Sequence, residues 1–187
     1  MRPICLKPFI LALALSLLPS SSAWSFPSQF DDLLEAYAGQ YLPEVDWRLL
    51  KAQCYQESLL VPTAVSPVGA QGLCQFMPGT WRDMQRQLGM SAGPFNPAAN
   101  VRAAAYYMRQ LRRSWSSPRP ETDRHNLAMA SYNAGMGNLL RAQRACGGPP
   151  GYDDIIACLP DITGHHSRET ITYVIRIRRW HGQMVVQ

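Results

Sequence analysis

Helical spacing of apolar residues, in segments separated by loops rich in glycine and proline, is the feature that most limits how this chain can fold. Apolar residues recur at intervals of three and four, as on one face of a helix, and no strand-like alternation extends beyond a few residues. The segments with this spacing are residues 43–58, 96–111, 127–132 and 167–180. The pattern predicts an all-α fold.

The ends of these helices are predicted from residues that favour helix caps and first turns. Pro43, with acidic residues just after it, is typical of a first turn, and Asn96-Pro97 is typical of another helix start. Ser167 is predicted to cap the last helix, and Gly135 to end the helix before it.

The first 23 residues have the pattern of a signal peptide. Arg2 and Lys7 precede an apolar run over residues 9–18, and small residues lead to a predicted cleavage position after Ala23. The run is about half of the roughly twenty residues that span a bilayer, so an uncleaved membrane anchor is the less favoured alternative. Cleavage would leave residues 24–187 as a single domain, periplasmic or secreted, with no stable membrane span.

The composition excludes a mainly disordered chain, because 47% of the 187 residues are hydrophobic and 17% are charged. The formal charge of +5 would fall to +3 with the leader, which contains two basic residues and no acidic one. A basic chain can bind an anionic glycan, a membrane surface or nucleic acid, but export and the absence of a nucleic-acid motif argue against nucleic acid. The arginines at 112–113 and 176–179 are expected in solvated faces or against peptide carboxylates.

Five cysteines become four without Cys5, and an oxidising compartment would allow two disulfides. The remaining cysteines are Cys54, Cys74, Cys146 and Cys158. Three connectivities are possible, of which we favour the local one, Cys54–Cys74 with Cys146–Cys158. A zinc site is the alternative, but there is no C-x-x-C and His165–His166 lacks a metal-binding spacing, so no metal is expected.

Glu57 interrupts an apolar helical stripe that includes Trp47, Leu50 and Cys54. Burial and the negative end of the helix dipole would both raise the pKa of its carboxyl group, towards an acid that still holds a proton near neutral pH. A structural glutamate paired with an arginine is the alternative. No clear second catalytic acid accompanies it, so on a sugar substrate Glu57 would act nearly alone.

Several sequence blocks, in order along residues 33–180, resemble the soluble lytic transglycosylase family. They are Gln56-Glu57-Ser58, the run 64–70 (AVSPVGA), 72–78 (GLCQFMP), Asn96-Pro97 with Asn100-Val101, 130–135 (ASYNAG), and Glu169-Thr170 with Tyr173-Val174. The resemblance implies a single lysozyme-like helical domain of the goose-type kind, acting as a monomer on peptidoglycan strands without a cofactor.

The resemblance also implies a reaction. The β-1,4 bond between N-acetylmuramic acid and N-acetylglucosamine would be cleaved without water, giving 1,6-anhydromuramic products. Glu57 would act first as the acid and then as the base, because an intramolecular hydroxyl needs no second carboxylate to activate it.

The substrate-binding positions that the resemblance implies are Ser66, Gln75, Tyr132, Asn133, Glu169 and Tyr173. Ser66 would lie near Glu57 and the N-acetyl group, and Tyr173 would orient or contact Glu57. The structural alternatives are a turn serine at 66, a backbone-capping glutamine at 75, a core tyrosine at 132 and a helix-ending asparagine at 133.

The chain departs from the family at Cys74, where a methionine is usual. A Cys54–Cys74 bridge would tie the helix of Glu57 to the G-L-C-Q segment. Rival functions are a hydrolytic goose-type lysozyme and a non-catalytic peptidoglycan-binding or secretion-accessory module. The sequence leaves open endo- or exo-cleavage, and whether the chain serves general wall metabolism or a secretion or conjugation apparatus.

Overall fold

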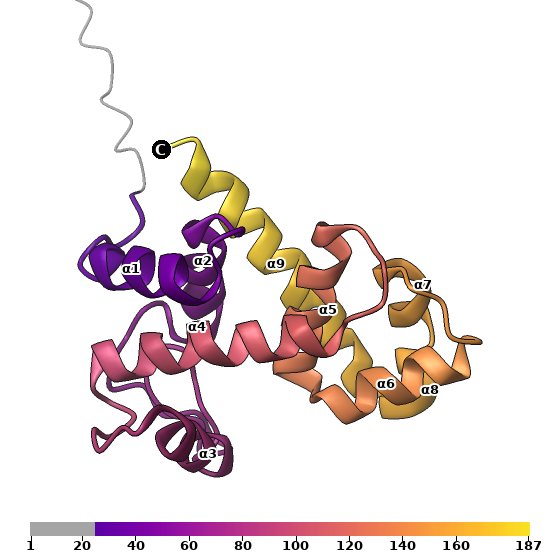
Figure 1. Cartoon of the computed structure of the whole chain (residues 1–187), viewed down its shortest axis with the longest axis horizontal. Helices are drawn as coiled ribbons and strands as arrows, with labels where there is room; N and C mark the ends of the chain where they lie inside the picture. The colour runs from indigo at the N-terminus through magenta and orange to yellow at the C-terminus, as the bar shows by residue number, and fades with distance from the viewer. Residues whose placement is uncertain (1–24) are drawn as a thin grey trace, which may run out of the picture.

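The computed structural model describes residues 25–187, and the described chain is all-α, as predicted (Figure 1). Its helices are α1 (Asp31–Tyr41), α2 (Trp47–Ser58), α3 (Pro78–Leu88), α4 (Pro97–Ser114), α5 (Glu121–Ala134), α6 (Met136–Ala145), α7 (Tyr152–Ala157), α8 (Leu159–Thr163), the 3₁₀ helix η1 (Gly164–His166) and α9 (Ser167–Val185). The strand-like pairs within this range are isolated bridges that join Gln71 to Val65 and Phe76. The predicted signal peptide lies outside the described residues.

Helix α4 forms the centre of the fold and packs against α1, α3 and α5 (Figure 1). The apolar stripe predicted for this helix is buried throughout: Val101, Ala104, Ala105, Met108 and Leu111. Its alanines have short side chains, so neighbouring helices can approach closely. The long helix α9 runs across the molecule from the α6–α8 region to α2, against which it packs extensively.

The helix starts agree with the sequence only in part. Asn96 caps α4 as predicted, since its Oδ1 accepts from the amide of Ala99 at 2.9 Å. The start predicted at Pro43 is wrong, because α2 begins at Trp47. The Asp46 side chain accepts from the Arg48 amide at 3.0 Å and so supplies the cap, while Pro43 lies in the preceding turn.

Ser167 begins α9 but does not cap it in the predicted way. Its Oγ donates to the carbonyl of Gly164 at 2.7 Å, because η1 continues directly into α9 and leaves no free helix end at Ser167. Gly135 ends α5 as predicted, with a positive φ of 85° that favours glycine.

The structure contains the two local disulfides, Cys54–Cys74 and Cys146–Cys158, with Cα–Cα distances of 4.4 and 5.8 Å. The expectation of a solvated Arg112 is wrong. This residue is 9% exposed, and its guanidinium donates to Glu121 at 2.8 Å, because the start of α5 covers the end of α4.

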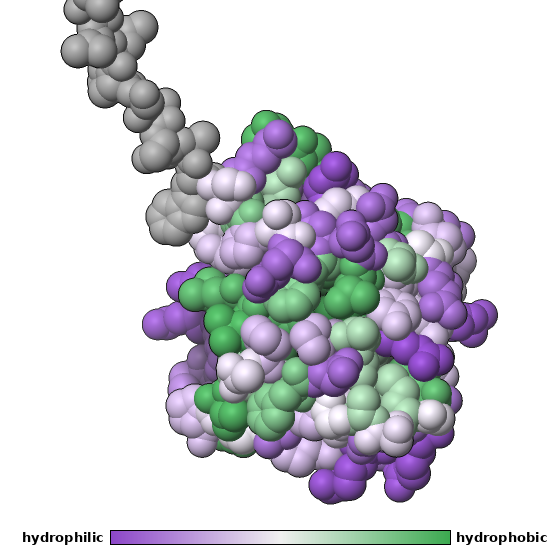
Figure 2. Space-filling model, turned by 90° about the vertical axis from the view of Figure 1, so that its left-hand side faces the viewer, coloured by the Kyte–Doolittle hydropathy of each residue, from purple (hydrophilic) through white to green (hydrophobic). Residues whose placement is uncertain are grey.

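Apolar and polar side chains are mixed on the face turned to the viewer in Figure 2, where apolar ones form a band between purple regions. Across residues 25–187, no helix combines the length and the apolar character that a bilayer crossing requires.

Candidate active site

Glu57 lies in the last turn of α2, where its carboxyl group is largely removed from water. The pKa of Glu57 is raised to about 7, chiefly by burial and also by the nearby carboxylate of Glu169. The hydroxyl of Tyr173 donates to Oε1 of Glu57 at 2.5 Å, and this hydrogen bond lowers the pKa. The balance leaves Glu57 protonated in a large fraction of molecules near neutral pH, as a general acid requires.

Tyr173 comes from α9, 116 residues further along the chain than Glu57. Its phenol is buried, and both burial and the charge of Glu57 raise its pKa well above the ordinary value. Tyr173 therefore stays neutral at physiological pH and acts as a hydrogen-bond donor to Glu57.

A cleft of about 570 Å³ opens beside Glu57. Its lining residues are Gln56, Glu57, Asn133, His165, His166, Arg168, Glu169, Thr172, Tyr173 and Arg176. Four of the site positions predicted from the sequence therefore share one cleft: Glu57, Asn133, Glu169 and Tyr173.

Hydrogen bonds hold one wall of this cleft together. Asn133 donates from Nδ2 to Glu169 at 3.3 Å and accepts from the hydroxyl of Thr170 at 2.7 Å. The end of α5 is thereby attached to the first turn of α9, next to Tyr173.

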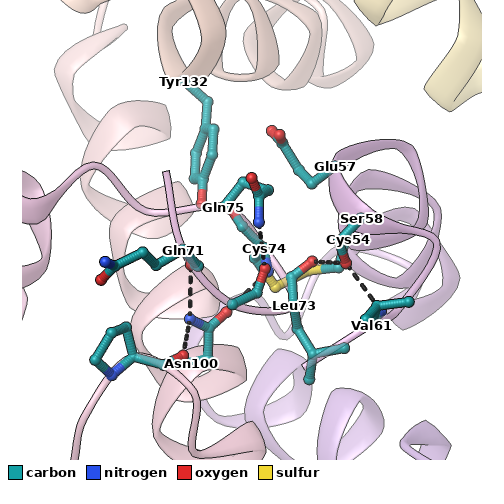
Figure 3. The surroundings of a disulfide bond; sticks show 12 residues. Cys54, Glu57, Ser58, Val61, Gln71, Leu73, Cys74, Gln75, Asn100 and Tyr132 are labelled. Atoms are coloured by element: carbon teal, nitrogen blue, oxygen red, sulfur yellow. Dashed lines mark hydrogen bonds between the residues drawn. A yellow bond between two sulfur atoms is a disulfide. The ribbon is translucent and has the colours of Figure 1, made fainter. Parts of the chain in front are cut away.

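Ser66, Gln75 and Tyr132 do not line this cleft, although Figure 3 shows the side chains of Gln75 and Tyr132 converging on the same region as that of Glu57. Ser66 Oγ accepts from the amide of Ala70 at 3.0 Å, as a turn serine does. Tyr132 donates to the carbonyl of Cys74 at 2.7 Å. Within the described chain, none of these three residues is hydrogen-bonded to Glu57.

Gln75 and Gly72 give the loop over residues 64–76 its shape. Gln75 has a positive φ of 51°, and its Nε2 donates to the carbonyls of Gly72 at 2.8 Å and Ala64 at 3.2 Å. A side chain at Gly72 would place its Cβ 2.2 Å from the carbonyl oxygen of Pro94, so only glycine fits there. The loop is thus braced from within.

Further contacts attach this loop to α2 and α4, beside Glu57 (Figure 3). Ser58 Oγ donates to the carbonyl of Leu73 at 2.7 Å, and the disulfide joins Cys54 to Cys74. The buried Asn100 accepts from the Cys74 amide at 2.8 Å.

Ser58 and Asn100 were not predicted as site residues, although both fall within the sequence blocks quoted above. Of the basic residues of the cleft, His165, His166 and Arg168 were not predicted to bind substrate, whereas Arg176 was expected in a solvated face or against peptide carboxylates. No pattern within the chain distinguishes them from solvated surface charge.

The described residues contain no group of three or more histidine, cysteine, aspartate or glutamate side chains arranged to hold a metal ion. Glu169 is the second carboxylate of the cleft, and it is exposed. The half-buried Glu57, with its raised pKa, can carry out proton transfer at this site.

Comparison with known proteins gives a consistent result. Residues 36–154 match the Transglycosylase SLT domain family. Membrane-bound lytic murein transglycosylase F from Alcanivorax borkumensis is 33% identical over 184 residues, covering 88% of this chain and 38% of the relative. The enzyme of the same name from Yersinia enterocolitica is 32% identical, covering 83% of this chain and 33% of the relative. The chain thus spans about a third of the length of these relatives.

Among solved structures, an inactive Glu-to-Gln mutant of the lytic transglycosylase Slt from Pseudomonas aeruginosa superposes with a TM-score of 0.66 at 26% identity. The match covers 86% of this chain and 25% of that one. The 70-kDa soluble lytic transglycosylase from Escherichia coli has a TM-score of 0.64 at 24% identity, over 86% of this chain and 25% of the other, and shows a shared fold.

Proposed function

This chain belongs to the Transglycosylase SLT domain family, and from that premise we propose that it is a peptidoglycan lytic transglycosylase. The observation that carries the proposal is Glu57, a half-buried carboxyl group with a raised pKa of about 7 that lines a cleft and accepts one hydrogen bond from Tyr173. Its relatives are named as lytic murein transglycosylases, which supports the same substrate.

In the proposed reaction, protonated Glu57 donates to the glycosidic oxygen between N-acetylmuramic acid and N-acetylglucosamine. The N-acetyl group of the substrate stabilises the cation that forms at the anomeric carbon. Ionised Glu57 then takes the proton of the C6 hydroxyl, which attacks the same carbon and closes the 1,6-anhydro ring. The pKa of Glu57 suits both steps, because it lies close to the working pH.

Tyr173 has a defined part in this cycle. Its hydrogen bond to Oε1 stabilises the carboxylate that remains after the first proton transfer and keeps the carboxyl group oriented. We further propose that Ser66, Gln75, Tyr132 and Asn133 border the sugars on either side of the bond being cut.

Export to the periplasm is part of the proposal. The two disulfides support it, because such bonds persist in oxidising compartments. The leader over residues 1–23 would direct the export, and the chain would act on the wall as a monomer.

The test is the E57Q variant, assayed on purified sacculi. Loss of the acid should lower the cleavage rate by about 100- to 10,000-fold, while binding to sacculi is retained. Undiminished cleavage by E57Q would refute the assignment of the acid, and a wild-type chain that binds without cleaving would indicate a binding module.

Mass spectrometry of the products separates transglycosylation from hydrolysis. Anhydro products are lighter by one water molecule than hydrolytic ones. Products carrying the mass of that water would show that the chain is a hydrolase, with Glu169 then the candidate for the second carboxylate.

A further inference from the structure

Basic side chains line the cleft beside Glu57 without taking part in the acid–base chemistry. Arg168 and Arg176 lie eight residues apart on α9, with Thr172 between them, so they share one face of the helix over about 12 Å. His165 and His166 precede them in η1, with ring centroids 4.0 Å apart. These four residues, Arg168, Arg176, His165 and His166, are called the basic row below.

The two arginines of this row are not neutralised by the protein. Within residues 25–187, neither Arg168 nor Arg176 has a carboxylate within 4.0 Å or a hydrogen bond to its guanidinium, and both are exposed. Elsewhere on the chain the pattern differs, because Arg112 and Arg124 both bind Glu121.

The acidic groups that face the row are few. Glu57 is protonated in a large fraction of molecules near neutral pH, and Glu169 already accepts a hydrogen bond from Asn133. The cleft therefore has two arginines against Glu169 and the partly protonated Glu57, so it carries positive charge where a substrate would lie.

We infer that the basic row binds the carboxylates of the peptide attached to muramic acid, and that the chain prefers strands with charged peptides. This inference rests on the proposed function. Muramic acid carries its peptide on the lactyl group, next to the bond that Glu57 would cleave, and the peptide bears free carboxylates. The planar guanidinium of an arginine binds a carboxylate through two parallel hydrogen bonds, which suits Arg168 and Arg176 to this role.

The experiment compares two substrates of the same size that differ in charge. One is un-cross-linked, peptide-bearing glycan strands; the other is the same strands with their carboxylates converted to amides by carbodiimide and ammonium. The wild-type chain should have about a tenfold higher kcat/KM on the charged strands at low salt, since each exposed ion pair is worth only a small factor. The preference should shrink as salt is raised.

The R168Q/R176Q variant should lose this preference, because its kcat/KM should fall on charged strands by about the tenfold that separates the two substrates, and by less on amidated strands. R113Q/R144Q is the matched control, because it removes two exposed arginines on other helices and changes the net charge equally. The control should keep the preference. Equal rates of the wild-type chain on both substrates would overturn the inference, and so would an equal loss by R168Q/R176Q on both.

A binding measurement keeps the inference testable if the proposed reaction fails. E57Q should be retained more strongly on charged than on amidated strands, and E57Q/R168Q/R176Q should bind both alike. Equal retention of E57Q on the two substrates would contradict the basic row as a carboxylate site, whatever the chain does catalytically.

Discussion

At the scale of single residues, the acid strength of Glu57 depends on effects of opposite sign. Burial and the charge of Glu169 disfavour the carboxylate, whereas the hydrogen bond from Tyr173 favours it. Because the first proposed step needs protonated Glu57, kcat/KM should fall as the pH rises through the pKa of Glu57, about 7.

We predict that Y173F and E169Q move this fall in opposite directions. Y173F removes the donor to the carboxylate, so the pKa of Glu57 rises and the fall moves to higher pH. Its maximal rate should also drop by about tenfold, because a hydrogen bond to a charged group contributes about 1.5–3 kcal/mol. E169Q removes a negative charge, so the pKa of Glu57 falls and the decrease in kcat/KM moves to lower pH.

The measurement is the pH profile of kcat/KM for the three proteins on the same glycan strands. E169Q is a conservative partner for this comparison, because an amide at 169 can still accept from Asn133. If kcat/KM fell at the same pH in all three proteins, the group that titrates in the pH profile would not be Glu57.

At the scale of elements, the Cys54–Cys74 disulfide joins the helix of Glu57 to the loop over residues 64–76. The Cys146–Cys158 disulfide closes the region between α6 and α8, outside the contacts that hold Glu57. The two bonds have sequence separations of 20 and 12, for which loop entropy gives a similar stabilisation of about 3 kcal/mol each.

We therefore predict that removing either bond costs similar stability, whereas activity is more sensitive to the first. C54A/C74M should lower kcat by about tenfold, since the carboxyl group of Glu57 loses one of its supports. C146A/C158A should leave kcat within about twofold of the wild-type value. Urea unfolding and the cleavage rate, measured on both variants at a temperature where both are folded, provide the check. Equal losses of kcat would show that the first bond serves stability alone.

The sequence predicts the elements better than their ends and their tertiary partners. The buried stripe of α4 can be predicted from the spacing of its apolar residues, because a helix that buries one face needs apolar residues at intervals of three and four. Pro43 and Asp46 both suit a helix start, and only the structure shows that Asp46 supplies the cap. Tyr173 follows from the family resemblance and not from spacing, because a contact across 116 residues leaves no local pattern. Arg112 looks exposed from α4 alone and is buried by α5.

At the scale of the whole molecule, the candidate site is assembled from distant parts of the chain. Glu57 comes from α2, Asn133 from α5, and Tyr173 from α9, which packs along α2 (Figure 1). The family match ends at residue 154, before α9 begins. Because Tyr173 and Glu169 of α9 line the cleft with Glu57 of α2 and Asn133 of α5, the cleft forms only when α9 is packed against these helices.

The stability of the whole fold should then depend on the protonation of this site. The pKa of Glu57 is about 7 in the folded chain against an ordinary value of 4.5, so the folded state binds more protons between these pH values. Stability consequently falls as the pH rises through this window. Above pH 7 the ionised Glu57 costs the fold about 3 kcal/mol.

A second buried group acts in the opposite sense. Burial lowers the pKa of His125 to about 3 from 6.5, so the unfolded chain binds more protons between these values and stability falls as the pH drops through that window. Its contribution is the same in the wild-type chain and in any variant of Glu57. It therefore cancels when the two are compared at one pH.

We predict that E57Q is more stable than the wild-type chain, and that the difference depends on pH. Glutamine stays neutral and can still accept from Tyr173, so the variant escapes the cost of ionisation. The gain in Tm should be close to nil at pH 4.5 and reach about 6–12 °C at pH 8.5, because about 3 kcal/mol corresponds to about 2–4 °C per kcal/mol for a chain of this size. E35Q, which removes an exposed carboxylate on α1 that does not act on Glu57, serves as the matched control and should show no such trend. A gain in Tm that is the same at both pH values would mean that Glu57 is not held in its protonated form by the fold, and the acid role proposed for it would lose its physical basis.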